Sequence, residues 1–209
     1  FHIAGTGRPG PVVIDIPGDV MSEEAEFHYP EKVKLQGYKP TVKGHPAQVK
    51  KAARFIKESR RPLIIAGRGV VSSGAAAELK EFAEKAQMTV VNTLLGLGGF
   101  PGTHVLCLGM IGMHGLAHAN MAVNSADLII AVGMRFDDRA TATVAGFAPN
   151  AQVIHIDIDP AEIGKNVRVD VPIVGDVKNV LKVLNNEVES QNRVDWLSQI
   201  EKWEREHPP

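Results

Sequence analysis

Hydrophobic and polar positions along the chain fall into two alternating kinds of segment. The first kind is a short apolar run, typical of a strand buried on both faces. Such runs occupy residues 63–67, 88–93, 127–132, 151–159 and 171–176. A sixth strand is expected around residues 104–108, where the pattern is weaker. The sequence therefore predicts five clear strands and one less distinct strand.

The second kind of segment carries apolar residues at helical spacing, with charged residues on the opposite face. Helices are expected from Pro46, from Ala75, over residues 117–126, from Val177, and in the tail around Trp196. Strands that alternate with amphipathic helices indicate an α/β domain. We predict a doubly wound, six-stranded parallel sheet with helices on both of its faces.

The start of the chain differs from the rest. Residues 7–17 read as a strand bracketed by prolines, and residues 18–45 have little periodicity. The chain begins at Phe1 without methionine and without a signal or transit segment. We therefore expect a piece of a longer protein, divided into a segment with one strand (1–20), a linker (21–45), an α/β domain (46–190) and a helical tail (191–209).

Composition narrows the function classes only a little. The chain is 44% hydrophobic and 22% charged, with a net charge of -1. Near-neutral balance gives no electrostatic reason to expect nucleic acid or an anionic membrane surface as a partner. The one cysteine, Cys107, excludes an intrachain disulfide and fits a reducing, cytoplasmic compartment.

Ligands of such sheets bind outside the carboxyl ends of the strands. Gly67, Gly69 and Gly74 follow the first core strand, yet their spacing does not match the dinucleotide fingerprint. The next strand ends in Asn92 and Thr93, where an NAD site requires a carboxylate. Ordinary NAD chemistry is disfavoured, and a tight strand-to-helix turn explains these glycines equally well.

The stretch "RFDDR", which follows Gly133, sets Arg135 and Arg139 close to Asp137 at the end of a buried strand. Guanidinium groups match phosphate oxygens in two-point geometry. Arg8 could supply a third guanidinium to a pyrophosphate. A solvated turn with internal charge pairs is the alternative, and the residue types leave both interpretations open.

Other polar residues at the strand ends have equally plain alternatives. Asp157 could accept hydrogen bonds from ribose hydroxyls, and Asp176 could contact a base, but capping of a helix explains Asp159 and Asp176 as well. A helix is expected to begin at Pro160. His114 and His118 have helical spacing but lack the glutamate of a zinc motif, so no metal site is predicted.

The stretches "GRPGPVVIDIPGDV", "NTLLGLGGFPGTH", "LGMIGMHGLAHANMAVNSADLIIAVGMRFDDR" and "AQVIHIDIDPAEIGKN" together resemble large catalytic subunits of the acetolactate synthase family, which are thiamine-diphosphate enzymes. The likeness runs through nearly the whole chain in the same order. It implies a Rossmann-like central domain, with the thiamine diphosphate and Mg²⁺ sites in domains absent from this chain. Residues 1–20 would then be the last strand of the truncated N-terminal pyrimidine-binding domain, and residues 191–209 the start of the linker to the C-terminal domain. The fragment alone is expected to be inactive.

The resemblance also implies that this domain holds FAD in a mainly structural role. Arg8, Arg135, Asp137 and Arg139 would surround the phosphates and ribitol together with Gly67, Gly69 and Gly133. The flavin side is assigned to Thr93, Leu94, Met113 and His114, and the adenosine side to Asp157, Ile158, Asp176 and Val177. Arg68 and Leu116 depart from the usual family residues, and the role of Arg68 is left open.

The parent enzyme implied by this resemblance would condense two pyruvates, or pyruvate with 2-oxobutyrate, with loss of CO₂ in branched-chain amino acid biosynthesis. It would act as a dimer or tetramer, with a small regulatory subunit. Two other hypotheses stay open at this stage. They are the nucleotide-binding middle domain of another thiamine-diphosphate decarboxylase or carboligase, and a stand-alone nucleotide-binding module.

Overall fold

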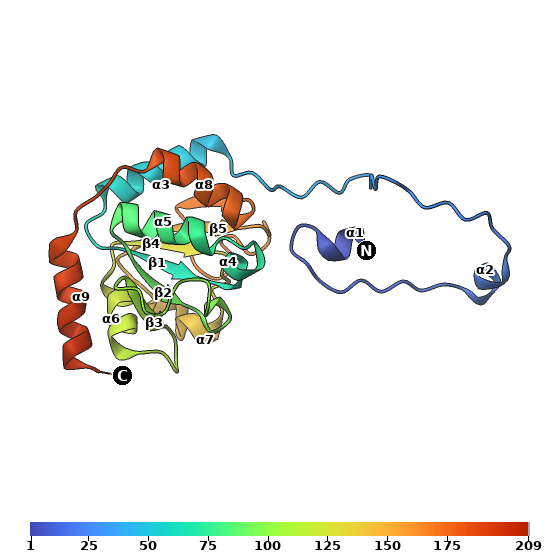
Figure 1. Ribbon diagram of the computed structural model, residues 1–209. Coiled ribbons are helices and arrows are strands. Elements are labelled where there is room, and N and C mark those ends of the chain that lie inside the picture. Colours follow the sequence, from blue (N-terminus) through green and yellow to red (C-terminus); the bar gives the residue numbers. More distant parts are fainter. Residues whose placement is uncertain (209) are drawn as a thin grey trace. The chain divides into compact units, whose positions relative to one another are not determined.

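The structure is a computed structural model that describes residues 1–208. The chain divides into two compact units, Phe1–Pro40 and Thr41–Pro209. The second unit contains a six-stranded, all-parallel sheet in the order β3-β2-β1-β4-β5-β6 (Figure 1). Its strands are β1 (Pro62–Ala66), β2 (Thr89–Asn92), β3 (Cys107–Met110), β4 (Leu128–Val132), β5 (Gln152–Asp157) and β6 (Val171–Val174). The predicted fold class is confirmed, and the sixth strand is β3.

Helices connect these strands and cover the sheet. The longer ones are α3 (Pro46–Glu58), α5 (Ala76–Ala86), α6 (Ala117–Ser125), α8 (Val177–Glu187) and α9 (Val194–Glu206). Short ones follow strand ends or loops: α4 (Arg68–Ser72), α7 (Asp138–Thr141) and the 3₁₀ turns η1 (Leu94–Gly96) and η2 (Val144–Gly146). The predicted helical segments are confirmed: the 3.6-residue period is strong in α3, α5, α8 and α9 and weak in α6, whereas the short turns had no such signal.

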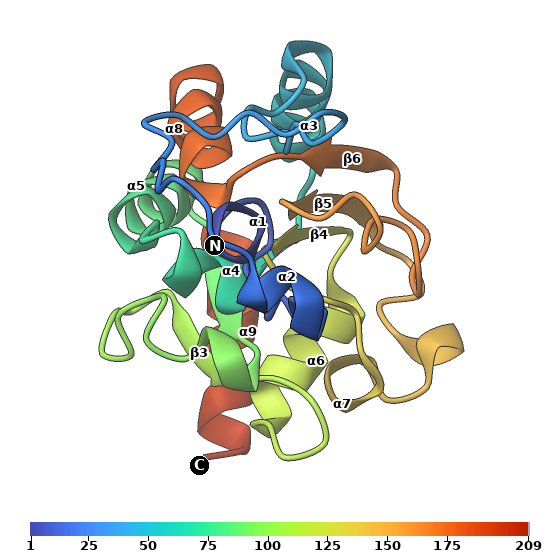
Figure 2. The ribbon, with the colours of Figure 1, turned by 90° about the vertical axis from the view of Figure 1, so that its right-hand side faces the viewer.

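The two faces of the sheet have separate cores. Because successive strand residues point to opposite faces, Ile64 and Ala66 of β1 pack in one core and Leu63 and Ile65 in the other. Helices α3, α5 and α8 cover the first face, and α6 and α9 cover the second (Figure 2). All of β1 and β4 is buried, which explains why the sequence shows continuous apolar runs there.

The first unit has a different character. It contains two short helices, α1 (His2–Gly5) and α2 (Gly18–Ser22). Tyr38, near the end of the unit, contacts its beginning, because the Tyr38 hydroxyl donates to the carbonyl of Thr6 at 3.0 Å. No strand forms within residues 7–17 in this structure, and Val13 is 91% exposed; the assignment of this segment to the last strand of another domain stays a prediction. A strand requires a partner strand for its backbone groups, and none of residues 1–40 forms one.

One expectation about the second unit fails. The helix expected from Pro160 is a series of turns, so Asp159 is not a helix N-cap. The carboxylate of Asp159 instead accepts a hydrogen bond from the N–H of Ala161 at 3.0 Å. Gly164 then adopts a φ of +72°, a left-handed conformation that ends a helical run. The connection from β5 to β6 is consequently a loop.

Candidate functional site

The strand order places a topological switch point between β1 and β4. From β1 the chain moves outward to β2 and β3, and it then returns to the other side of β1 to form β4, β5 and β6. The loops after β1 and β4 thus leave the sheet in opposite directions, which is where open parallel sheets bind their ligands. The candidate site lies at this carboxyl edge.

Three glycines allow the loops after β1 and β4 to touch. The N–H of Gly69 donates to the carbonyl of Gly133 at 2.8 Å. A Cβ on Gly67 would lie 2.4 Å from the oxygen of Gly133, and Gly133 itself has a φ of +58°. The close approach made possible by these glycines is therefore between two parts of the backbone. The strand-to-helix turn is confirmed, since α4 begins at Arg68.

The loop after β2 crosses the end of β1. The N–H of Thr93 donates to the carbonyl of Ala66 at 2.9 Å, and a Cβ on Gly96 would lie only 2.1 Å from that same oxygen. Thr93 is half-buried, whereas Leu94 is 68% exposed. Thr93 therefore lies next to Ala66 at the end of β1, and Leu94 is turned to the surface.

The loop after β3 reaches the RFDDR segment. Gly112 has a φ of +100°, and a Cβ there would meet the carbonyl oxygen of Arg139 at 2.2 Å. The N–H of Met113 donates to that carbonyl at 3.3 Å. Met113 and His114 are both exposed. The structure thus brings Met113 and the RFDDR segment together from positions far apart in the sequence.

Within the RFDDR segment, apolar and charged side chains point in opposite directions. Met134 and Phe136 are buried at 3% and 4% exposure, while Arg135 between them is exposed. Asp137 caps α7 by accepting from the N–H of Ala140 at 3.2 Å, and it lies 3.8 Å from the guanidinium of Arg135. Because Met134 and Phe136 point inward, Arg135 between them points outward. Asp137 serves the fold as the N-cap of α7.

Two contacts that the sequence analysis missed hold this segment, one of them buried and the other partly buried. The Nε2 of His155 contacts the carbonyl oxygen of Met134 at 2.8 Å, and the side-chain amide of Asn166 donates to the carbonyl of Phe136 at 2.7 Å. His155 is fully buried. A titratable residue inside the apolar run "VIHIDI" was the signal available in the sequence.

Burial lowers the pKa of His155 below its ordinary value, and the bond to Met134 and the charge of Glu162 oppose this shift. The imidazole is therefore neutral near pH 7, and its Nε2–H donates to Met134. The 4.0 Å approach between His155 and Asp157 is for this reason not an ion pair.

The carboxyl ends of β5 and β6 carry the residues assigned to the adenosine side. Asp157 is 7% exposed and accepts from the N–H of Asp159 at 2.9 Å, and Ile158 beside it is half-buried. The N–H of Gly175 donates to the carbonyl of Asp157 at 2.9 Å, which places Asp176 next to it.

Asp176 caps α8 by accepting from the N–H of Asn179 at 3.1 Å, so its capping interpretation is confirmed. The Val177 side chain is buried in the core below α8. Only the backbone of Val177 could therefore face a ligand.

Arg8 belongs to the first unit, where its side chain is exposed. Its assignment to the site rests on the resemblance and stays a prediction. The other assigned residues lie at the carboxyl ends of the strands of one sheet, or in the loops and first helical turns that follow them.

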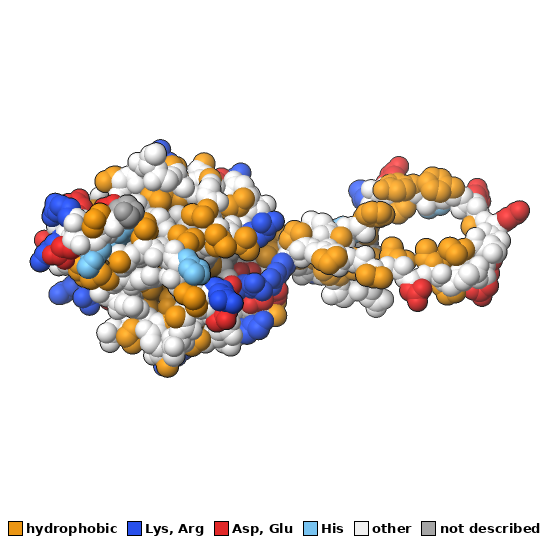
Figure 3. All heavy atoms as spheres, turned by 90° about the horizontal axis from the view of Figure 1, so that it is seen from below, with side chains coloured by type: hydrophobic (Ala, Val, Ile, Leu, Met, Phe, Trp, Pro, Cys, Tyr) orange, Lys and Arg blue, Asp and Glu red, His pale blue; other side chains and the backbone are white. Residues whose placement is uncertain are grey.

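Two open cavities of the second unit lie away from the carboxyl edge. One of about 360 Å³ is lined by residues of α5, β2, β3 and α9, and one of about 950 Å³ lies around residues 59–61 and the start of α9. The carboxyl edge instead carries exposed apolar side chains, including Leu94, Leu97 and Met113, near its arginines. On the face of the molecule shown in Figure 3, hydrophobic patches lie beside a group of basic side chains. Such a surface fits a ligand laid across the strand ends better than one enclosed in a pocket.

Within residues 1–208, no group of three or more His, Cys, Asp or Glu side chains is arranged to hold a metal ion. In the same part of the chain, each helix is too short or too polar to cross a membrane.

Comparisons with known proteins agree with this geometry. Residues 49–184 match the family described as thiamine pyrophosphate enzyme, central domain. The chain is 54% identical over 206 residues to a probable acetolactate synthase large subunit of Methanocaldococcus jannaschii, which covers 96% of this chain and 35% of that protein. It is 45% identical to the acetolactate synthase isozyme 3 large subunit of Escherichia coli, over 97% of this chain and 37% of that protein.

A large subunit from Buchnera aphidicola is 44% identical over 98% of the chain. The chain spans little more than a third of the length of these relatives. The matched region contains all six strands and the loops at the carboxyl edge. The chain belongs to the family of thiamine pyrophosphate enzyme central domains, and its similarity to acetolactate synthase large subunits confirms the resemblance inferred from its motifs.

Proposed function

We propose that this chain is the FAD-holding central domain of an acetolactate synthase large subunit. The observation that carries the proposal is the continuous row of loops at the carboxyl edge, joined by backbone hydrogen bonds from Met113 to Gly175. Six strands span five spacings, roughly 24 Å. That length suits a dinucleotide better than a single nucleotide.

The order of residues along this edge supports the same ligand. The residues assigned to the flavin follow β2 and β3, and those assigned to adenosine follow β5 and β6. The arginine segment follows β4, between these two groups. A dinucleotide lying along the edge would therefore meet an apolar surface, then guanidinium groups, then carboxylates. These matches favour a flavin at one end, a diphosphate in the middle and a ribose at the other end.

The side chains present fit FAD chemically. Leu94 and Met113 expose apolar and polarizable surface to a flat ring. Arg135 and Arg139 are exposed and can pair with phosphate oxygens in forked geometry. Bound FAD would have a mainly structural role and would cover the carboxyl edge of the sheet. The chain's own part is to bind and orient it.

The activity of the whole protein belongs to this proposal as well. The parent enzyme would join two pyruvates, or pyruvate and 2-oxobutyrate, through thiamine diphosphate and Mg²⁺ bound by other domains. It would act as a homodimer or tetramer with a small regulatory subunit. Incubation of the 209-residue chain with pyruvate, thiamine diphosphate and Mg²⁺ should yield no acetolactate, and turnover by this chain alone would contradict the proposal.

The FAD proposal is tested by titrating the 209-residue chain with FAD and following flavin fluorescence. Arg135→Ala should weaken binding about tenfold, since it removes a charged hydrogen-bonding partner. Arg54→Ala on α3 is the matched control, because Arg54 is exposed and lies outside the site. Binding of NAD⁺ that is tighter than binding of FAD, or an Arg135→Ala chain with unchanged affinity, would count against the assignment.

A further inference from the structure

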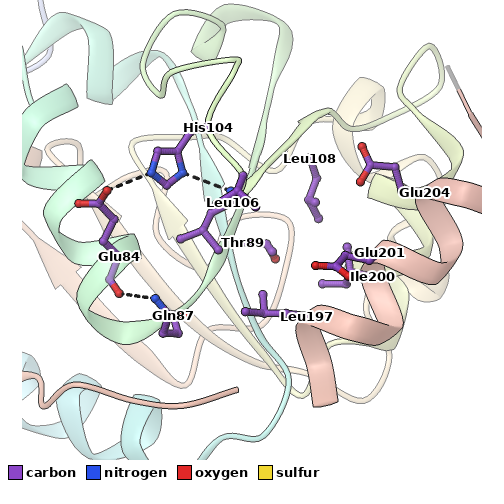
Figure 4. A pocket seen from close by; sticks show the side chains of 11 residues that line it. Glu84, Gln87, Thr89, His104, Leu106, Leu108, Leu197, Ile200, Glu201 and Glu204 are labelled. Carbon is purple, nitrogen blue, oxygen red and sulfur yellow. Dashed lines mark hydrogen bonds and ion pairs between the residues drawn. The ribbon is translucent and has the colours of Figure 1, made fainter. Parts of the chain in front are cut away.

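A second candidate site lies at the opposite, amino edge of the sheet. Here the start of β2, the residues before β3, the end of α5 and the face of α9 enclose the cavity of about 360 Å³ (Figure 4). Its volume falls within the range of small-molecule sites. None of its lining residues belongs to the loops of the carboxyl edge.

The cavity has an apolar wall. Leu106 and Leu108 come from the β3 side, and Leu197 and Ile200 from α9. In Figure 4 these side chains lie between α9 and the helix that carries Glu84. A ligand that enters must therefore present an apolar body to this wall.

The hydroxyl of Thr89 adds a polar feature to the cavity. Thr89 lines the cavity and is 2% exposed, and its Oγ1 finds no hydrogen-bond partner among the described residues. Thr89 pairs in register with Leu63, which packs in the core beneath α9, so the two side chains share that face. A buried hydroxyl without a partner is costly. Because its oxygen is almost fully covered, a polar ligand atom would reach it after rotation of the Thr89 side chain, and that contact would remove the cost.

Carboxylates surround the cavity. Glu84 on α5 is held by His104, whose Nε2 lies 3.0 Å from Oε1 of Glu84 while its Nδ1 accepts from the N–H of Leu106. Glu201 and Glu204 lie across the cavity on α9 (Figure 4). Within residues 1–208, neither of these two has a cationic partner within ion-pair distance. Because Glu84 is already paired with Lys80 and His104, the acidic character of the rim comes from Glu201 and Glu204, which suit a positive charge.

We propose that this cavity is a binding site for a small organic cation. The ligand class is a protonated amine that carries an apolar body and a hydrogen-bonding group at its far end. The ammonium would lie at the carboxylate rim, the body against the leucine and isoleucine wall, and the far polar group at Thr89. An anion would face repulsion from Glu201 and Glu204. A small molecule fits better than a protein segment because the unpaired hydroxyl lies below the rim.

This inference is independent of the FAD proposal, since the two sites occupy opposite edges of the sheet. The probe is tyramine, which carries an ammonium, an aromatic ring and a phenolic hydroxyl. Its binding is followed by amide chemical shifts of the ¹⁵N-labelled 209-residue chain. Phenethylamine lacks the hydroxyl, 4-ethylphenol lacks the charge, and 3-(4-hydroxyphenyl)propionate reverses it.

Saturable shifts with tyramine should centre on Thr89, Leu106 and Ile200, with weaker binding of the first two analogues and none of the propionate. Thr89→Val should weaken tyramine about fivefold, the factor of one net hydrogen bond, and leave phenethylamine unchanged. The double variant Glu201→Gln with Glu204→Gln should weaken both amines about fourfold. Glu81→Gln with Glu187→Gln removes two exposed carboxylates outside the cavity and should leave both affinities unchanged.

Three results would overturn the proposal. The first is the absence of saturable shifts at millimolar tyramine, and the second is equal binding of tyramine and the propionate. The third is binding of a lysine-containing amphipathic peptide at this cavity by a chain that binds none of the amines. Thr89→Val retains a β-branched side chain of similar size, so it should fold and keep the test informative.

Discussion

The two edges of the sheet are built from different parts of the chain. At the carboxyl edge, loops touch backbone to backbone, because a Cβ on Gly67, Gly96 or Gly133 would clash with a neighbouring main chain. At the amino edge, long side chains make the connections. The guanidinium of Arg193 donates to the carbonyls of Ile56, Ser59 and Ala86. Glycines therefore allow the backbone contacts at the carboxyl edge of the sheet, whereas an arginine side chain makes the contacts at the amino edge.

This difference explains where the cavities lie. Backbone contacts bring the loops of the carboxyl edge close together, and this edge offers a surface across the strand ends. At the amino edge, α9 packs on the sheet through Trp196 and Ile200, and both cavities lie beside this helix. An extended nucleotide suits the first arrangement, and a compact ligand suits the second.

The largest expected effect tests the backbone contacts. Gly133→Ala should lower the free energy of unfolding by about 4 kcal/mol, because it combines a positive φ with a crowded neighbour. A Cβ there would lie 2.5 Å from the Cα of Gly69. Urea unfolding of the 209-residue chain measures the change.

Gly74→Ala is the matched control for this prediction. Gly74 has a φ of +62° but nothing within 4 Å of its Cβ position. Its replacement by alanine should lower the free energy of unfolding by about 1 kcal/mol, which is the cost of the positive φ without any steric clash. If the two variants lose equal stability, close packing of the loops is not what makes glycine necessary at position 133.

The second effect tests the amino edge. Arg193→Met keeps most of the side-chain volume but leaves three carbonyls without their charged donor, so it should cost about 3 kcal/mol. Arg60→Met, at an exposed residue of the same cavity, should stay within about 0.5 kcal/mol. Chemical denaturation measures the free energy of unfolding of both variants. Equal losses would show that the hydrogen bonds of the Arg193 guanidinium do not stabilise this edge.

Much of the fold could be predicted because its signals are local and periodic. Apolar runs such as residues 128–132 and the helical stripe that includes Val49 and Ile56 are confirmed. Differences arose where the outcome depended on missing partners or on single side chains. Residues 12–16 have strand composition but no neighbouring strand, and the turn at Asp159 replaced the expected helix.

The candidate site was predictable in position but not in detail. The rule that ligands bind at carboxyl ends of strands located the loops, and the structure joins them in one row. Sequence could not show that Arg135 points outward because Met134 and Phe136 point inward. Nor could it show that His155 and Asn166 fix the two carbonyls beside it, since those contacts span long sequence separations.

The third effect concerns pH at the carboxyl edge. The pKa of His155 is lowered from 6.5 by burial, so the unfolded chain binds a proton more readily than the folded chain. Its contribution to stability is present above pH 6.5 and is lost as the pH falls through the folded-state pKa. The slope is at most about 1.4 kcal/mol per pH unit.

His155→Gln should reduce the slope of the free energy of unfolding against pH. Urea unfolding at several pH values below 6.5 measures this slope. Asn166→Ala removes the neighbouring anchor at Phe136 without removing a titratable group, so it should lower stability equally at each pH. A His155→Gln chain that retains the full slope would show that the buried imidazole is not its source.

The smallest effect returns to the amino edge and concerns Thr89. Because its buried Oγ1 finds no partner in the described part of the chain, Thr89→Val should raise the free energy of unfolding by about 1 kcal/mol. Thr103→Val, at an exposed loop position, should change it by no more than about 0.5 kcal/mol. A stabilised Thr89→Val chain that also binds tyramine less tightly would show that the hydroxyl is costly to the fold yet useful to a ligand. If Thr89→Val instead destabilises the chain, the hydroxyl has a partner such as a buried water, and the polar feature of the proposed cation site is lost.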